Sequence, residues 1–195
     1  MKKKERPQRF DDFLGQEEIV DNLSIYIDAA KKRKEVLDHI IISGPSGMGK
    51  TTLAGIIANE MGSKITFMHG ANFEKQANII SVITAVKKGD IIFIDEIHRI
   101  NKVVEEILYT ALEDYRIDVI VGEGLEKRTI NIDIEPFCLI GATTMLGHLS
   151  IPLVNRFGID IIFKPYTEEA VLKLVEYYAN QYEVKIEKDA MKLIL

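Results

Sequence analysis

The chain has 195 residues with a formal net charge of −5, and 47% of its residues are hydrophobic and 28% charged. These values suit one globular domain with part of a second, and they exclude disorder, collagen and coiled coil as descriptions of the whole chain. The mild acidity argues against a protein that coats nucleic acid through bulk charge alone, but not against one that reaches nucleic acid through another domain or subunit.

Helices and strands alternate along the first half of the chain. Apolar residues at helical spacing predict helices over 16–31, 50–61, 79–86 and 101–113. Short apolar runs predict strands over 39–43, 65–68 and 90–95, the first of them buried. Gly62 is placed to cap the C-terminus of the second helix. This alternation is typical of an α/β fold, a parallel sheet with helices on both faces.

The second half interrupts this pattern once. Strands over 136–142 and 159–163 bring the predicted sheet to five, and a helix over 167–181 begins after Thr167 as N-cap. The β-rich runs 117–121 and 129–134 flank two glycines and predict a β-hairpin inserted before the fourth strand. Residues 188–195 continue an apolar helical pattern to the last residue, so we expect the second domain to be incomplete.

No segment predicts a membrane protein. The basic start, residues 1–10, is followed by no apolar run typical of a secretory signal. Residues 136–154 carry no formal charge, but they are too polar and too interrupted by proline and glycine for a spanning helix. The single cysteine, Cys138, excludes an internal disulfide framework and predicts a core residue of a cytoplasmic protein.

A phosphate-binding loop lies between the first strand and the second helix. Residues 44–51 read GPSGMGKT and fit the P-loop pattern G-x-x-x-x-G-K-[ST] in the required strand–loop–helix context. Its glycines let backbone N–H groups close around phosphate oxygens, Lys50 would bind the β- and γ-phosphates, and the Thr51 hydroxyl would bind Mg²⁺. A dinucleotide-binding loop is excluded, because Thr52 stands where its third glycine is required.

Two acidic residues follow the third strand. Asp95 is placed to reach Mg²⁺, directly or through water, and Glu96 to orient or deprotonate the attacking water. Two acids after a strand would more often be a solvated loop, but a preceding P-loop reverses that preference.

Two further features point to the γ-phosphate. Thr143 and Thr144 end the fourth strand, at the edge where open α/β sheets bind ligands, and a hydroxyl there can sense the γ-phosphate. Arg156 is a candidate arginine finger for the site of a neighbouring subunit. Without the preceding motifs it would be interpreted as a surface salt-bridge arginine.

The histidines predict no metal site, because none has ligand spacing to cysteines or acids. His98, in the run DEIH over 95–98, resembles the DExH box of superfamily-2 helicases. Those enzymes need a second RecA-like domain, for which this chain has no room. They therefore remain the weaker alternative.

The order of these motifs resembles the RuvB family, bacterial AAA+ motors of Holliday-junction branch migration. The resemblance covers nearly the whole chain. It is carried by RP at 6–7, FDDFLGQ at 10–16, the P-loop, IDEIHR at 94–99, EDYR at 113–116, IGATT at 140–144, FGI at 157–159 and YT at 166–167.

The resemblance implies an AAA+ ATPase domain over 1–165 and the beginning of a helical lid over 166–195, with a winged-helix DNA-binding domain absent from the chain. It implies ATP or ADP with Mg²⁺, a hexameric ring, and Holliday-junction DNA as a partner of the full-length protein. The hairpin over 117–134 would dock RuvA. The implied nucleotide-binding residues are Arg6, Gly44, Gly47, Gly49, Lys50, Thr51, Thr52, Asp114, Tyr115, Arg116, Arg156 and Tyr166.

Four positions depart from the family's usual residues. Ser46 and Met48 are expected to face away from the phosphates and to be harmless. Met145 and Val154 stand where arginines are usual, so subunit contacts or their coupling to nucleotide could be weaker.

Three functions are therefore open. The first is an ATP-driven DNA motor subunit, the second a nucleotide-binding and RuvA-docking module without motor activity, and the third a clamp-loader-like AAA+ ATPase. The S-R-C signature of clamp loaders is absent, because PLVNRF stands at 152–157.

Overall fold

Five parallel strands form the centre of the protein, in a computed structural model that describes residues 6–121, 128–187 and 190–191. The strand order is β2-β3-β6-β1-β7, and every pair is parallel, which confirms the predicted sheet. The strands are β1 (Ile40–Ser43), β2 (Ile65–His69), β3 (Ile91–Asp95), β6 (Cys138–Thr143) and β7 (Ile159–Ile162).

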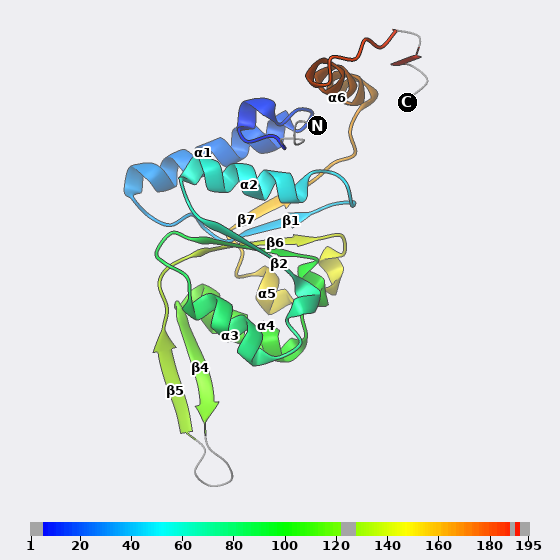
Figure 1. Cartoon of the computed structure of the whole chain (residues 1–195). Coiled ribbons are helices and arrows are strands. Elements are labelled where there is room, and N and C mark those ends of the chain that lie inside the picture. Colours follow the sequence, from blue (N-terminus) through cyan, green and yellow to red (C-terminus); the bar gives the residue numbers. More distant parts are fainter. Residues whose placement is uncertain (1–5, 122–127, 188–189, 192–195) are drawn as a thin grey trace.

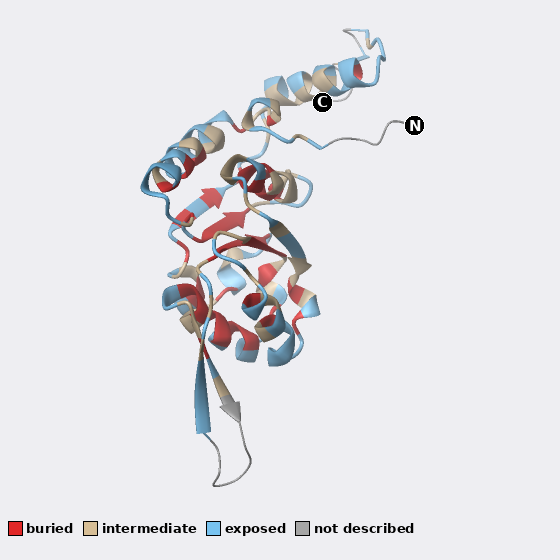
Figure 2. Cartoon of the chain, turned by 60° about the vertical axis from the view of Figure 1, so that its left-hand side comes forward, coloured by how far each residue is buried: buried red, intermediate tan, exposed pale blue. Residues whose placement is uncertain are grey.

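Helices cover both faces of this sheet (Figure 1). On one face lie α1 (Glu17–Arg33) and α2 (Lys50–Met61), and on the other α3 (Gln76–Thr84), α4 (Lys102–Glu113) and α5 (Ile151–Val154). Successive strand residues point to opposite faces, so Ile40 and Ile42 pack in the first core layer and Ile41 in the second. The buried residues accordingly gather in the sheet and on the helix faces toward it (Figure 2).

The helix ends follow the predicted capping. Gly62 ends α2 in the left-handed conformation, with φ 67°, and its N–H donates to the carbonyls of Ala58 and Asn59. The Thr167 side chain accepts the N–H of Ala170 at the start of α6 (Glu168–Gln181). These contacts satisfy backbone groups that a helix leaves unpaired at its ends.

The predicted hairpin is confirmed as β4 (Arg116–Val121) paired antiparallel with β5 (Arg128–Asp133). Its register runs from Arg116 opposite Asp133 to Val121 opposite Arg128. Ile117 anchors its base in the core, and the two strands extend away from the body (Figure 1). The predicted connection, with its glycines at 122 and 124 and its tip over 125–128, lies outside the described residues except for Arg128, which begins β5.

Several short elements were not predicted. They are the four-residue helix α5 and the 3-10 turns Phe10–Asp12, Gly70–Asn72, Ile97–Arg99 and Leu146–His148. Most of the predicted helical stretch 188–195 lies outside the described residues. Within the part of the chain that the structure describes, no helix combines the length and apolarity needed to cross a bilayer. Cys138 is buried in the core, as predicted.

Candidate functional site

The loop between β1 and α2 turns on glycines that other residues would strain. Gly49, at the start of α2, has φ 98°, and Gly44, at the end of β1, has φ 148°. A Cβ at Gly44 would lie 2.6 Å from the Cβ of Phe163, so no larger residue fits there. The loop thus exposes its backbone N–H groups and the amino end of α2 on one side.

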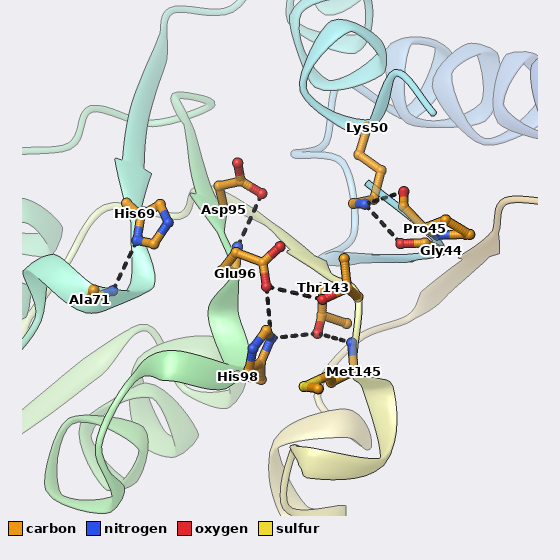
Figure 3. Close-up of polar contacts among 11 residues, drawn as sticks. Gly44, Pro45, Lys50, His69, Ala71, Asp95, Glu96, His98, Thr143 and Met145 are labelled. Carbon is orange, nitrogen blue, oxygen red and sulfur yellow. Dashed lines mark hydrogen bonds and ion pairs between the residues drawn. The ribbon is translucent and has the colours of Figure 1, made fainter. Parts of the chain in front are cut away.

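Lys50 is the first residue of α2 and only 7% exposed. Its Nζ donates hydrogen bonds of 2.8 Å to the carbonyls of Gly44 and Pro45 (Figure 3). Burial lowers the pKa of Lys50, while the charges of Asp95 and Glu96 act in the opposite direction. The ammonium is therefore held above the loop, where phosphate oxygens could replace the two carbonyls as acceptors.

A polar cavity of about 280 Å³ opens beside Lys50. It unites the P-loop with the predicted acids, and its lining residues are Arg6, Ser46, Gly47, Gly49, Lys50, Thr51, Thr52, Asp95 and Glu96. Ser46, expected to face away from the phosphates, is one of the residues that line this cavity.

A second cavity of about 220 Å³ adjoins the first, because Gly47, Gly49 and Thr52 line both. Its other lining residues are Pro7, Asp12, Phe13, Leu14, Met48, Tyr166, Leu174, Tyr177 and Tyr178. Tyr166 was predicted, and its hydroxyl donates to the Met48 carbonyl at 3.2 Å. The sequence analysis missed the residues of α6 that line this cavity and the two that follow the 3-10 turn Phe10–Asp12, namely Phe13 and Leu14. Together the cavities could take a phosphorylated end and an apolar ring of one ligand.

Asp95 and Glu96 leave β3 in a sharp turn. Glu96 has φ 49°, and its N–H donates to Asp95 Oδ1 at 3.0 Å. Gly70 permits this turn, because a Cβ there would lie 2.3 Å from the Glu96 carbonyl oxygen. The two carboxylates are thereby presented to the same cavity.

The oxygen atoms in the cavity suit a magnesium ion bound together with phosphates. The Thr51 hydroxyl and the Asp95 carboxylate are hard oxygen donors, and Mg²⁺ commonly takes one or two such protein ligands plus phosphate oxygens and water. Within the described residues, no group of three or more His, Cys, Asp or Glu side chains could hold a metal alone.

Thr143 and Thr144 point to different partners. The Thr143 hydroxyl is fully buried, accepts the Met145 N–H at 2.9 Å and lies 2.9 Å from His98 Nδ1. Thr144 is exposed and donates to Glu96 Oε2 at 3.2 Å. Of the two predicted threonines, only Thr144 contacts Glu96 directly. His98 was missed as a site residue, although its position in the DEIH run was visible.

Arg156 lies at the opposite end of the parallel strands from the P-loop. The following Gly158 N–H donates to the carbonyl of His39, which precedes β1, whereas the P-loop follows the other end of that strand. The four residues of β1 span about 13 Å at roughly 3.3 Å each. Arg156 Nη2 pairs with Glu113 Oε2 at 2.5 Å. The structure therefore does not bring Arg156 to the cavity of its own chain.

Asp114, Tyr115 and Arg116, predicted to bind nucleotide, also lie at this far end of the strands. The Tyr115 ring packs against His39 and Phe137. Arg116 Nε lies 3.3 Å from Asp118 Oδ1, and Arg116 Nη2 lies 4.0 Å from Asp114. None of the three predicted residues lines either cavity.

Comparison with known proteins identifies close relatives of this chain. Residues 5–163 match the model of the Holliday junction DNA helicase RuvB P-loop domain. The chain is 46% identical over 189 residues to the Holliday junction branch migration complex subunit RuvB of Kosmotoga olearia, covering 97% of this chain and 55% of the relative. It is 49% identical over 184 residues to the subunit of the same name from Salinibacter ruber, covering 94% and 54%.

A solved structure shares the fold. The Thermotoga maritima RuvB Holliday junction branch migration motor superposes with a TM-score of 0.86 at 43% identity, over 97% of this chain and 58% of that one. The chain thus spans about half the length of the curated relatives it matches.

Proposed function

The chain belongs to the RuvB family of AAA+ P-loop proteins, and from this premise we propose that it is the ATP-hydrolysing part of a DNA motor subunit that drives Holliday-junction branch migration. One observation carries the proposal: Lys50 and Thr51 share a cavity with Asp95 and Glu96. Such a cavity combines phosphate binding with a carboxylate able to activate water. Family membership leaves no support for the clamp-loader and superfamily-2 alternatives.

The polar cavity would hold the triphosphate and the aromatic cavity the adenine of ATP or ADP. Lys50 would exchange its two carbonyl partners for β- and γ-phosphate oxygens. Thr51 and Asp95 would hold Mg²⁺, which when bound neutralises phosphate charge. Glu96 would accept a proton from the attacking water, and Thr144, bonded to Glu96, is the better placed of the two threonines to sense the γ-phosphate. Arg6 would add positive charge at the mouth.

Arg156 would act on the nucleotide of a neighbouring subunit. Its place at the far edge of the sheet favours this assignment over action on its own nucleotide, and Asp114, Tyr115 and Arg116 at the same edge would face that neighbour. Arginine fingers supplied in trans accelerate GTP hydrolysis by about 10³–10⁵-fold. Such an assignment requires a neighbouring subunit, and the family resemblance favours a hexameric ring.

The remaining assignments rest on the resemblance. The β4–β5 hairpin, whose Ile130 side chain is 46% exposed, would dock RuvA. Junction DNA would be gripped by parts of the full-length protein, in the cytoplasm. The RuvA-docking module without motor activity remains the alternative for this chain, because it spans only about half of its relatives.

Mixing two inactive variants tests the proposal. Lys50→Ala removes the nucleotide site but leaves the finger, whereas Arg156→Ala does the reverse. Losing two charge-assisted hydrogen bonds at about 1.5–3 kcal/mol each should weaken ATP binding at least 10²-fold in Lys50→Ala. Arg156→Ala should bind Mg-ATP normally and hydrolyse it at least about 10³-fold more slowly.

The mixture should recover hydrolysis, because mixed rings pair an intact site with an intact finger. Arg33→Ala, which removes a surface arginine paired with Glu35, is the matched control and should hydrolyse normally. Tight Mg-ATP binding with no hydrolysis in any preparation would favour the docking module. If the wild type hydrolyses ATP but the mixture recovers no activity, the action of Arg156 on a neighbouring subunit is refuted and the ATPase proposal stands.

A further inference from the structure

We propose that His98 is a positioning residue for Glu96: it holds one carboxylate oxygen so that the other stays free toward the nucleotide cavity. This inference rests on the proposed ATPase function, since it deepens the role of a side chain in that site. His98 follows β3 in the 3-10 turn Ile97–Arg99, and Figure 3 shows its ring beside the Glu96 carboxylate.

The two oxygens of Glu96 have different surroundings. Oε2 lies 3.2 Å from His98 Nδ1 and accepts a hydrogen bond of 3.2 Å from the Thr144 hydroxyl. Over the described parts of the chain, Oε1 has no hydrogen-bond partner, and the Glu96 side chain is 25% exposed where it lines the cavity. A carboxylate fixed through one oxygen keeps the other available to accept a proton from water.

His98 is itself held firmly. Its side chain is only 11% exposed, and its Nδ1 lies 2.9 Å from the Thr143 hydroxyl. That hydroxyl is fully buried at the end of β6 and accepts the N–H of Met145. The His148 ring packs edge-on at 6.2 Å between centroids. The imidazole is therefore anchored to a central strand, and its orientation is set by packing as well as by polar contacts.

One nitrogen serves both partners. Because the Thr143 oxygen already accepts the Met145 N–H, its own hydrogen can go to Nδ1 when this nitrogen carries no proton. When Nδ1 carries a proton, it can donate to the Glu96 carboxylate, a stronger, charge-assisted bond. His98 thus links the end of β6 to the carboxylate that would activate water.

Removing the ring should lower the rate without weakening nucleotide binding. His98 lines neither the polar cavity nor the aromatic cavity, so it has no direct contact with the nucleotide to lose. Without it, the Glu96 carboxylate keeps, among the described residues, only the bond from exposed Thr144. A misplacement of about 1 Å at a reacting group can cost about 10²-fold in rate.

Three variants separate positioning from structure. His98→Ala should lower kcat about 10–10²-fold with the Kd for a fluorescent ATP analogue unchanged within about twofold. His98→Asn should restore most of the rate, because its side-chain amide nitrogen occupies nearly the same place as Nδ1. Arg33→Ala, which removes an exposed arginine that lines neither cavity, is the control and should keep kcat near wild type.

Glu96→Gln keeps the inference separable from the proposed function. If Glu96→Gln abolishes hydrolysis while His98→Ala keeps wild-type kcat, the positioning role is overturned and the ATPase stands. If the wild type hydrolyses no faster than Lys50→Ala, both are overturned. A His98→Ala defect that His98→Asn does not relieve, or that comes with a raised Kd, would also refute positioning, because a structural role would explain it.

Discussion

Replacing Gly70 by alanine should slow hydrolysis, because the added Cβ would press on the backbone of Glu96. Gly70 is buried where β2 ends, and an added Cβ would lie 2.3 Å from the Glu96 carbonyl oxygen and 3.1 Å from its carbon. Real Cβ atoms almost never approach closer than 3.0 Å, so the two backbones must separate by the difference, about 0.7 Å. Such a shift moves Glu96 relative to the phosphates and should lower kcat about 10–10²-fold.

The strain should also lower the free energy of unfolding, by about 1–3 kcal/mol, the usual cost of overpacking. Gly55 provides a matched control, because it lies inside α2 with no atom within 4 Å of an added Cβ. Gly55→Ala should raise stability by about 0.5–1 kcal/mol and leave kcat unchanged. The assays are steady-state hydrolysis, ATP-analogue binding and urea unfolding. Gly70→Ala with wild-type kcat would refute the reasoning.

Two further predictions concern pH and docking. The ring of buried His39 accepts the Leu139 N–H at Nδ1 and contacts the Leu112 carbonyl through Nε2, and burial lowers its pKa from the ordinary 6.5. The unfolded chain therefore takes up the proton first as pH falls below about 6.5, so the free energy of unfolding should fall there. Urea unfolding at pH 7.5 and 5.5 measures this fall. If His39→Gln loses as much stability between the two pH values as the wild type, the prediction is contradicted. Ile130→Asp should weaken binding of RuvA without changing hydrolysis, measured by titration calorimetry, whereas Ile25→Asp on α1, also exposed, should change neither.

Much of the fold was predictable because its signals are local. Apolar runs interrupted by glycine and proline predicted every strand of the sheet, and the caps Gly62 and Thr167 marked helix ends correctly. The P-loop was equally local, since strand, glycines, Lys50 and helix are consecutive. Short elements escaped for the same reason: α5 has only four residues, too few to display helical periodicity.

The rest of the site depends on tertiary placement. The aromatic cavity joins Phe13 near the start of the chain to Tyr177 and Tyr178 of α6, and no short pattern relates such distant positions. The position of Tyr115 required knowing at which edge of the sheet α4 ends. For Thr143 and Thr144, the motif indicated a sensor of the γ-phosphate but did not distinguish the two residues. The structure distinguishes them, because Thr143 contacts His98 and Thr144 contacts Glu96.

The segment 143–156 connects the two ends of the parallel strands, from the end of β6 to the start of β7. It starts beside Glu96, through Thr144, and ends at Arg156 on the far side. Midway, the Ser150 hydroxyl donates to the buried Glu105 carboxylate and lies 2.9 Å from the Tyr109 hydroxyl, so α4 holds this segment through a partly buried polar network. Leaving the buried Glu105 carboxylate without its hydrogen-bond donor would cost about 1–3 kcal/mol, which opposes independent movement of either end. In the proposed ring, Thr144 would sense the nucleotide of its own subunit and Arg156 would act on the nucleotide of a neighbouring subunit. The two side chains would therefore move together, as parts of one packed body.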